Sequence, residues 1–162
     1  MAAMTTGTTP EVTRTNDMEA VRVLGVACGL EDSERATEEV VAAWGARVST
    51  GLVGAIVLER DRGLDVVNWL SVDEEFRGRG LAGRLYAELE REARRRGVRR
   101  LWVTARAPGF FARQDFVPLE TGPESRHLLR ACAACRQYGR TCRPQALYKD
   151  LGETSPSPNG SS

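Results

Sequence analysis

Residues 66–83 read VVNWLSVDEEFRGRGLAG, and this stretch decides the fold. Its first part, residues 66–72, is rich in apolar and β-branched residues, which predicts a buried strand. The glycines that follow let the backbone turn tightly, because glycine has no Cβ and adopts positive φ easily. A helix is predicted to begin near Leu81. Because the first turn of a helix leaves backbone N–H groups unpaired and carries partial positive charge, this junction predicts an anion site.

The helix after the turn has the clearest pattern in the chain. Glu88, Glu90 and Glu92 are expected to face water, with Glu92–Arg96 as a favourable pair one turn apart. Gly97 is expected to end the helix as its C′ residue. Apolar residues recur every four positions and predict one buried stripe, made of Leu81, Leu85, Leu89 and Ala93.

The rest of the chain alternates between strand and helix patterns, which indicates an α+β layered domain. Asp17 is expected to cap a first helix that stops near Gly29, and Pro108 to open a short third helix. Ser49 to Gly51 and Arg60 to Gly63 read as turns. The expected strands are residues 11–15, 40–48, 52–58, 66–72, 101–104, 116–119 and 146–151.

Length and composition favour a single domain over residues 11–151, with disordered segments at 1–10 and 152–162. The chain has 162 residues and a formal net charge of +1, which gives no electrostatic case for nucleic acid or an anionic membrane. No apolar stretch approaches a membrane span. Residues 1–10 lack the features of a secretion signal, so a cytoplasmic location is expected. A homodimer stays open at this stage.

Two known phosphate-binding motifs fit the glycine-rich turn poorly. A P-loop needs Lys and then Ser or Thr after its last glycine, and none follows Gly83. Residues 78–83 match the string GxGxxG of dinucleotide-binding proteins. That motif requires a parallel βαβ unit with an acidic partner, whereas the strands before this turn are expected to form an antiparallel meander.

Residues 72–83 resemble the acetyl-CoA motif of the GNAT superfamily of N-acetyltransferases, whose pattern Q/R-x-x-G-x-G/A falls here on Arg77, Gly80 and Ala82. The resemblance covers about residues 40–119. It implies the GNAT fold, a mixed and mostly antiparallel central sheet flanked by helices, and acetyl-CoA as cosubstrate. Turn amides would hold the pyrophosphate, and the strand would pair with the pantetheine arm. The implied cofactor residues are Leu70, Ser71, Val72, Arg77, Gly78, Arg79, Gly80, Leu81, Ala82 and Gly83.

Members of this superfamily usually transfer acetyl directly to an amine, which must first lose a proton to a base. The sequence departs from the usual pattern at two places. Val66 stands where many relatives carry Glu, with Asp65 adjacent. Phe111 stands where many relatives carry a Tyr that donates a proton to the leaving thiolate. Asp115 replaces a Gly and tolerates a left-handed turn. A water-assisted mechanism is therefore expected, with Asp65 and Asn68 as catalytic candidates; Asn68 could instead only bond a neighbour.

Residues 104–113, TARAPGFFAR, resemble a narrower branch of short N-acetylglutamate synthases and arsenic-resistance-associated amino-acid acetyltransferases. The resemblance implies a small amine as acceptor, such as the amino acid glutamate. Arg106 could pair with a substrate carboxylate, for which its guanidinium fork is well shaped, or could be an ordinary surface residue. Thr104 is the second substrate-binding candidate. A protein N-acetyltransferase is an alternative.

A cluster near the C-terminus offers four ligands of the type that zinc prefers: His127, Cys132, Cys135 and Cys142. The spacing lacks the paired CxxC motifs of a strong zinc signature, so reduced thiols are the alternative reading. With the usual Glu and Tyr missing, a second class of function is open. In this alternative the domain binds acetyl-CoA as a catalytically weak sensor with a metal or thiol site.

Overall fold

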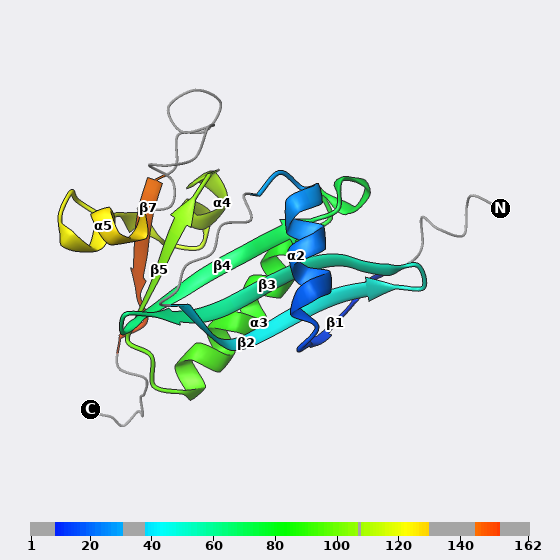
Figure 1. The fold of residues 1–162 in the computed structure, drawn as a ribbon, viewed down its shortest axis with the longest axis horizontal. Coiled ribbons are helices and arrows are strands. Elements are labelled where there is room, and N and C mark those ends of the chain that lie inside the picture. Colours follow the sequence, from blue (N-terminus) through cyan, green and yellow to red (C-terminus); the bar gives the residue numbers. More distant parts are fainter. Residues whose placement is uncertain (1–8, 31–37, 107, 130–144, 153–162) are drawn as a thin grey trace. The chain divides into compact units, whose positions relative to one another are not determined.

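The computed structural model describes residues 9–30, 38–106, 108–129 and 145–152 (Figure 1). Among these residues the strands form a seven-stranded sheet in the order β1-β2-β3-β4-β5-β7-β6. β4 and β5 are parallel, whereas the β1–β2, β5–β7 and β6–β7 pairs are antiparallel. The predicted α+β fold is therefore confirmed.

In chain order the elements are β1 (Glu11–Arg14), α2 (Met18–Ala27), β2 (Glu38–Val48), β3 (Gly51–Asp61), β4 (Leu64–Val72), the 3-10 helix η1 (Glu74–Phe76), α3 (Leu81–Arg95), β5 (Arg100–Ala105), α4 (Pro108–Arg113), β6 (Val117–Pro118), α5 (Pro123–Leu128) and β7 (Gln145–Asp150).

Contacts divide the chain into two compact units. β3, β4 and α3 each contribute residues to both units. The glycine-rich turn belongs to the first unit, and the C-terminal strands belong to the second. The expectation of one domain over residues 11–151 stays a prediction. The first unit comprises Met1–Asp32, Val40–Leu58 and Trp69–Arg91, and the second comprises Ser33–Glu39, Glu59–Asn68 and Glu92–Ser162.

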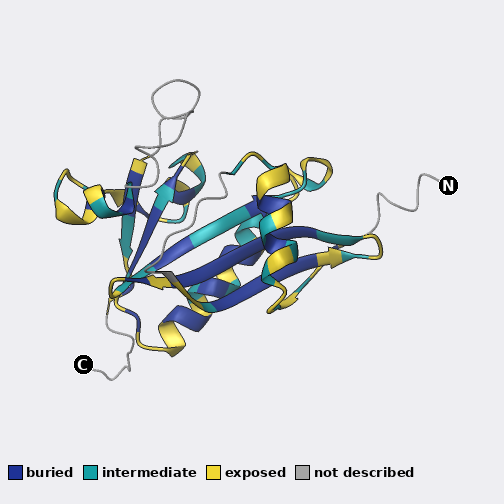
Figure 2. Cartoon of the chain, viewed as in Figure 1, coloured by how far each residue is buried: buried dark blue, intermediate teal, exposed yellow. Residues whose placement is uncertain are grey.

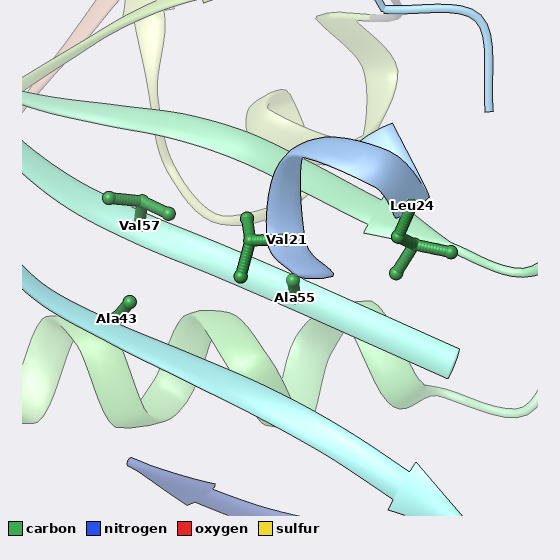
Figure 3. Close-up of a cluster of buried hydrophobic side chains, with 5 residues drawn as sticks. All are labelled: Val21, Leu24, Ala43, Ala55 and Val57. Atoms are coloured by element: carbon green, nitrogen blue, oxygen red, sulfur yellow. The ribbon is translucent and has the colours of Figure 1, made fainter. Parts of the chain in front are cut away.

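In the first unit, α2 packs on strands β2 and β3. Its start is capped as predicted, because the Asp17 carboxylate accepts a hydrogen bond of 3.1 Å from the Ala20 N–H. The helix ends near Gly29, which has φ of 97°. Figure 3 shows the buried cluster that α2 makes with the two strands, formed by Val21, Leu24, Ala43, Ala55 and Val57.

Helix α3 covers the opposite face of β3 in this unit. A Cβ added at Gly54 would lie 3.1 Å from the Leu85 side chain and 3.2 Å from that of Leu81. Since Gly54 and Ala55 are consecutive strand residues, they face opposite sides, with α3 on one and α2 on the other (Figure 1). Figure 2 shows that β2 and β3 are buried along most of their length in this unit. All four residues of the predicted stripe are buried: Leu81, Leu85, Leu89 and Ala93.

The C-terminal end of α3 also follows the prediction. Gly97 has φ of 80°, and the N–H groups of Gly97 and Val98 donate to the carbonyls of Arg94 and Ala93. These two bonds are the pattern of a helix that ends on a left-handed glycine. Gly97 is therefore the C′ residue.

The expectation that Glu92 faces water was wrong. Glu92 is only 9% exposed, and it accepts hydrogen bonds of 2.5 Å from Arg95 Nη2 and 2.7 Å from Arg96 Nε. The bond from Arg95, followed by that from Arg96, lowers the pKa of Glu92 to about 2, against the opposing effect of desolvation. The predicted Glu92–Arg96 pair is thus confirmed. The last two arginines of the helical segment make burial of the carboxylate acceptable.

The turn between β3 and β4 is shorter than predicted. Strand β3 continues through Asp61, so only Arg62 and Gly63 form the turn, with φ of 54° and 82°. Two consecutive residues with positive φ match the tight hairpin turn whose twist suits the flanking strands. The sequence prediction ended the strand at Leu58 because charged residues follow. Two of them, Glu59 and Asp61, are buried in the strand.

In the second unit, β5 pairs with β4 and β7 beside a small core of Val66, Trp102, Leu128 and Ala146. The sequence analysis missed α5, a six-residue helix that contributes Leu128 to this core. Phe111 on α4 is buried and stacks edge-on against Phe116, with ring centroids 5.2 Å apart. Asp115 adopts the left-handed conformation as predicted, with φ of 72°. No helix within the described ranges has the length and apolar character needed to cross a membrane.

Candidate active site

The glycine-rich turn lies in the first unit, directly before α3. Gly78 and Gly80 both have φ of 78°, a left-handed conformation that residues with a side chain rarely adopt. A Cβ added at either glycine would meet no atom within 4 Å, so the backbone can be approached closely. The first helical bond of α3 runs from the Arg84 N–H to the Gly80 carbonyl at 3.1 Å. The amides of the first turn therefore remain available to a ligand, as at any helix N-terminus.

The electrostatics of this turn suit an anion. The first turn of α3, a helix that the structure describes in full, carries no acidic residue. Arg77 and Arg79 add positive charge on either side of Gly78. The positive end of the α3 dipole adds to their attraction for phosphate. The segment thus fits the pyrophosphate that the sequence analysis assigned to it.

The two arginines also fix the shape of the loop. Arg77 Nε donates a hydrogen bond of 2.9 Å to the Val72 carbonyl, and Arg79 Nη2 donates one of 3.1 Å to the Glu75 carbonyl. The Arg79 guanidinium lies over the Phe76 ring, 4.9 Å from its centroid. These contacts orient the exposed loop before any ligand arrives.

The start of the loop is attached to the sheet. The Asp73 N–H donates a hydrogen bond of 2.8 Å to the Val53 carbonyl of β3. The Asp73 carboxylate accepts one of 2.9 Å from the Glu75 N–H and so caps η1. The loop therefore leaves β4 in a defined direction toward α3.

Strand β4 has an irregularity that the sequence analysis did not predict. Trp69 has φ of 54°, which is exceptional for a bulky residue inside a strand. Ser71 is buried, and its hydroxyl donates to the Trp69 carbonyl at 3.4 Å. The ladder with β5 ends at the pair Val67–Val103, before β4 itself ends at Val72. A period-of-two reading of the sequence carries no signal for this local distortion at Trp69.

The second unit contains a group of buried polar side chains that the sequence analysis overlooked. Glu59 is 3% exposed and Asp61 is 2% exposed. Glu59 Oε1 accepts a hydrogen bond of 2.9 Å from Asn68 Nδ2, and Asp61 Oδ1 lies 3.0 Å from His127 Nε2. The signal was present in the sequence, because Glu59 and Asp61 continue the alternation of β3 and so share one face.

The predicted catalytic and substrate residues all belong to the second unit. Asn68 donates a hydrogen bond to its neighbour Glu59, which is one of the two roles that the sequence left open for it. Asp65 Oδ1 accepts from Arg60, at 2.9 Å from Nη2 and 3.2 Å from Nε. The Thr104 hydroxyl donates to the Leu128 carbonyl at 3.0 Å. Arg106 is exposed directly after β5.

The predicted metal ligands are tested only in part. Cys132, Cys135 and Cys142 lie outside the described residues, and His127 contacts Asp61. Within the described ranges, no group of three or more His, Cys, Asp or Glu side chains could hold a metal ion. The zinc site stays a prediction. Cys28, the remaining cysteine, lies at the C-terminal cap of α2.

The fold and the glycine-rich turn fit an acetyltransferase of the type that uses an acyl-CoA donor. Residues 13–116 match the family model described as the acetyltransferase (GNAT) family, so the chain belongs to the GNAT acetyltransferases. It is an N-acetyltransferase by membership, with acetyl-CoA as cosubstrate.

Solved structures share this fold. Rv2747 from Mycobacterium tuberculosis, solved in complex with CoA and NLQ, is 19% identical, with a TM-score of 0.62 over 88% of this chain and 99% of that one. N-acetylglutamate synthase from Neisseria gonorrhoeae, complexed with coenzyme A and N-acetyl-glutamate, is 18% identical, with a TM-score of 0.65 over 89% of this chain and 35% of that one. A GNAT-family acetyltransferase from Staphylococcus aureus is 11% identical, with a TM-score of 0.62 over 88% and 99% of the two chains.

Proposed function

We propose that this acetyltransferase acetylates the amine of a small molecule, and that the acceptor is an amino acid such as glutamate. The observation that carries the cofactor half of the proposal is the pair of left-handed glycines, Gly78 and Gly80, at the start of α3. In the proposal, amides of residues 78–83 bind the pyrophosphate of acetyl-CoA. Backbone groups of Leu70 and Val72 pair with its pantetheine arm like an added strand.

The reaction joins the acceptor nitrogen to the acetyl carbonyl carbon and breaks the carbon–sulfur bond of the thioester. The amine must be neutral to attack, and the departing thiolate takes up a proton. In the proposal, Asn68 orients the acceptor, or the water that removes its proton. Its amide is itself held by the buried Glu59. Phe111 has no proton to give, so water protonates the thiolate.

Asp65 is the weaker of the two catalytic candidates. Its carboxylate is occupied by two bonds from Arg60. A role for Asp65 in proton transfer would require that ion pair to open. Asp65 therefore stays a prediction, and Asn68 carries the proposal.

The acceptor assignment rests on Arg106 and on the resemblance of residues 104–113 to amino-acid acetyltransferases. Arg106 is exposed at the end of β5, and its planar guanidinium matches a carboxylate with two parallel hydrogen bonds. Thr104, two residues earlier and within β5, offers a hydroxyl oxygen. A similar structure named N-acetylglutamate synthase contains N-acetyl-glutamate, which supports an acidic amino acid as the class to test first.

The test has two stages. Calorimetry first measures acetyl-CoA binding, and release of free CoA thiol is then followed with a panel of amino acids and other amines. Rapid turnover with glutamate or another amino acid is expected. Tight binding without turnover on any panel member would overturn the small-molecule assignment, and favour a protein acceptor or an acetyl-CoA sensor. The cytoplasmic location and a homodimer stay predictions.

Arg106→Ala sharpens the acceptor assignment. We expect the KM for the amino acid to rise about tenfold or more, because a bidentate carboxylate contact is lost, while acetyl-CoA affinity stays unchanged. Arg113→Ala removes another exposed arginine of the same unit and is the matched control. Equal KM values for the two variants would remove Arg106 from the proposal.

A further inference from the structure

The distortion of β4 at Trp69 requires support from its surroundings. Trp69 is held at φ of 54° inside the strand, a conformation that a bulky residue keeps only where neighbouring groups fix it. The residues after it, Leu70 to Val72, are those assigned to the pantetheine arm. Whatever holds Trp69 therefore sets the direction of backbone groups that the cofactor would use.

One support is the contact between the Trp69 ring and Gly25 on α2. A Cβ added at Gly25 would lie 2.4 Å from Cε3 and 2.6 Å from Cζ3 of Trp69, closer than real side chains approach. The ring packs against the apolar cluster around Val21 and Leu24, which Figure 3 shows on α2 above the strands. Because an indole ring is rigid, it cannot bend aside as an aliphatic chain can. The contact therefore needs a glycine at position 25.

A second contact comes from the last turn of the same helix. Cys28 Sγ lies 3.5 Å from the Val72 carbonyl oxygen, to which it donates. That oxygen also accepts the 2.9 Å hydrogen bond from Arg77 Nε. Helix α2 thus touches β4 at Trp69 and at Val72, on both sides of Leu70.

We propose that α2 is a clamp that holds residues 69–72 of β4 in the distorted conformation needed to bind the pantetheine and thioester part of acetyl-CoA. Gly25 and Trp69 are its positioning residues. The inference rests on the proposed function and deepens it, because it separates two parts of one cofactor site. The phosphates depend on residues 77–83, whereas the arm depends on the contact between Gly25 and Trp69.

The test compares acetyl-CoA with adenosine 3′,5′-bisphosphate, a fragment that lacks the pantetheine arm, by calorimetry. For Gly25→Ala we expect acetyl-CoA to bind about tenfold more weakly and acetyl transfer to slow by at least as much, because misplaced binding groups are costly. The affinity of the bisphosphate is expected to stay unchanged. Alanine suits a helix better than glycine does, so poorer helix formation cannot explain the loss.

Gly45→Ala is the matched control. Its added Cβ would lie 2.6 Å from Leu52 Cδ1, the flexible end of an aliphatic side chain, and so is relieved by a small rotation. We expect this variant to bind both ligands normally. The double variant Gly25→Ala with Trp69→Phe replaces the rigid indole by a smaller ring, and should recover part of the lost acetyl-CoA affinity.

Each outcome decides something different. Unchanged acetyl-CoA affinity in Gly25→Ala would overturn the clamp while leaving the proposed function intact. In another outcome, Gly25→Ala binds both acetyl-CoA and the bisphosphate more weakly. If the double variant with Trp69→Phe then recovers no binding, the clamp is also overturned, because the loss is not specific to the pantetheine arm. A wild-type protein that binds neither ligand would instead contradict the proposed function itself.

Discussion

The two units of the chain use different physical means to build their parts of the protein. In the first unit, α2 packs apolar side chains on Ala55 and Val57 of β3, and the ligand-binding turn depends on backbone conformation at glycines. In the second unit, the same strand buries Glu59 and Asp61, each bonded to another polar side chain. Apolar packing tolerates imperfect geometry, whereas a buried charge needs its partner in place. The second unit should therefore be more sensitive to loss of a single bond.

The largest expected effect is on acetyl-CoA affinity, and it tests whether the first unit binds the cofactor through the backbone conformation of its glycine-rich turn. Gly80→Leu should weaken acetyl-CoA binding by about a hundredfold or more, because a side chain at positive φ disturbs the turn and blocks the approach of the phosphates. Gly80 is exposed, so the fold should survive. Calorimetry with acetyl-CoA measures the loss.

Gly63→Leu is the control for this variant. Gly63 has φ of 82° and equally open space around a Cβ, but it lies in the β3–β4 turn of the second unit. It should incur similar strain and leave acetyl-CoA affinity unchanged. Normal binding by Gly80→Leu would contradict the assignment of residues 77–83 to the cofactor.

The next effect tests whether the buried polar group stabilises the second unit. Asp61→Ala removes the carboxylate that lies 3.0 Å from His127 Nε2, and should lower the free energy of unfolding by about 1–3 kcal/mol. Urea unfolding at neutral pH measures the change. His127→Ala should destabilise the protein by a similar amount. The double variant should then cost less than the sum of the two single changes, since both remove one interaction.

A smaller effect on stability is expected from Glu92, which lies in the part of α3 that belongs to the second unit. The pKa of Glu92, lowered to about 2 from its ordinary value of 4.5, means that its contribution to stability is fully present above pH 4.5. The contribution is lost as pH falls from 4.5 to about 2. Glu92→Gln should destabilise the protein by about 1–2 kcal/mol at pH 7 and remove this part of the acid dependence.

Glu88→Gln provides the matched comparison on the same helix. Glu88 pairs with Arg91 at 2.7 Å, but the Glu88 side chain is 37% exposed and that of Arg91 69% exposed. Its replacement should change the free energy of unfolding by about 0.5 kcal/mol or less, because exposed pairs contribute little. Identical acid-unfolding curves for the Glu92→Gln variant and the wild type would show that burial does not distinguish the two glutamates.

The smallest expected effect compares the exposed Arg60–Asp65 ion pair with the buried contact between Asp61 and His127 in the second unit. Arg60, half exposed, pairs with Asp65, and Arg60→Ala should cost less than about 1 kcal/mol. Urea unfolding beside Asp61→Ala makes the comparison. If Arg60→Ala destabilises the protein as strongly as Asp61→Ala does, burial is not what makes the second unit sensitive.

Local patterns along the chain were sufficient for much of the fold. The four-residue spacing from Leu81 to Ala93 predicted the buried stripe of α3, and Asp17 and Gly97 marked the ends of two helices. These features depend on contacts between residues a few positions apart. The left-handed conformation of Asp115 was legible for the same reason.

The sequence by itself determined most of the elements, the glycine-rich turn and the family to which they belong, because each depends on chemistry carried within a short segment. Tertiary structure decided which charged residues are buried and where β4 departs from a regular strand. The predicted strand ended before Glu59, and Asp61 was placed in the turn, whereas in the fold both are buried beside partners on other elements, Asn68 and His127. Trp69 read as an ordinary strand residue, but it has φ of 54° and its ring lies against Gly25 on another element. Burial of a charge and distortion of a strand are both unfavourable locally, so only partners brought by the fold can make them stable.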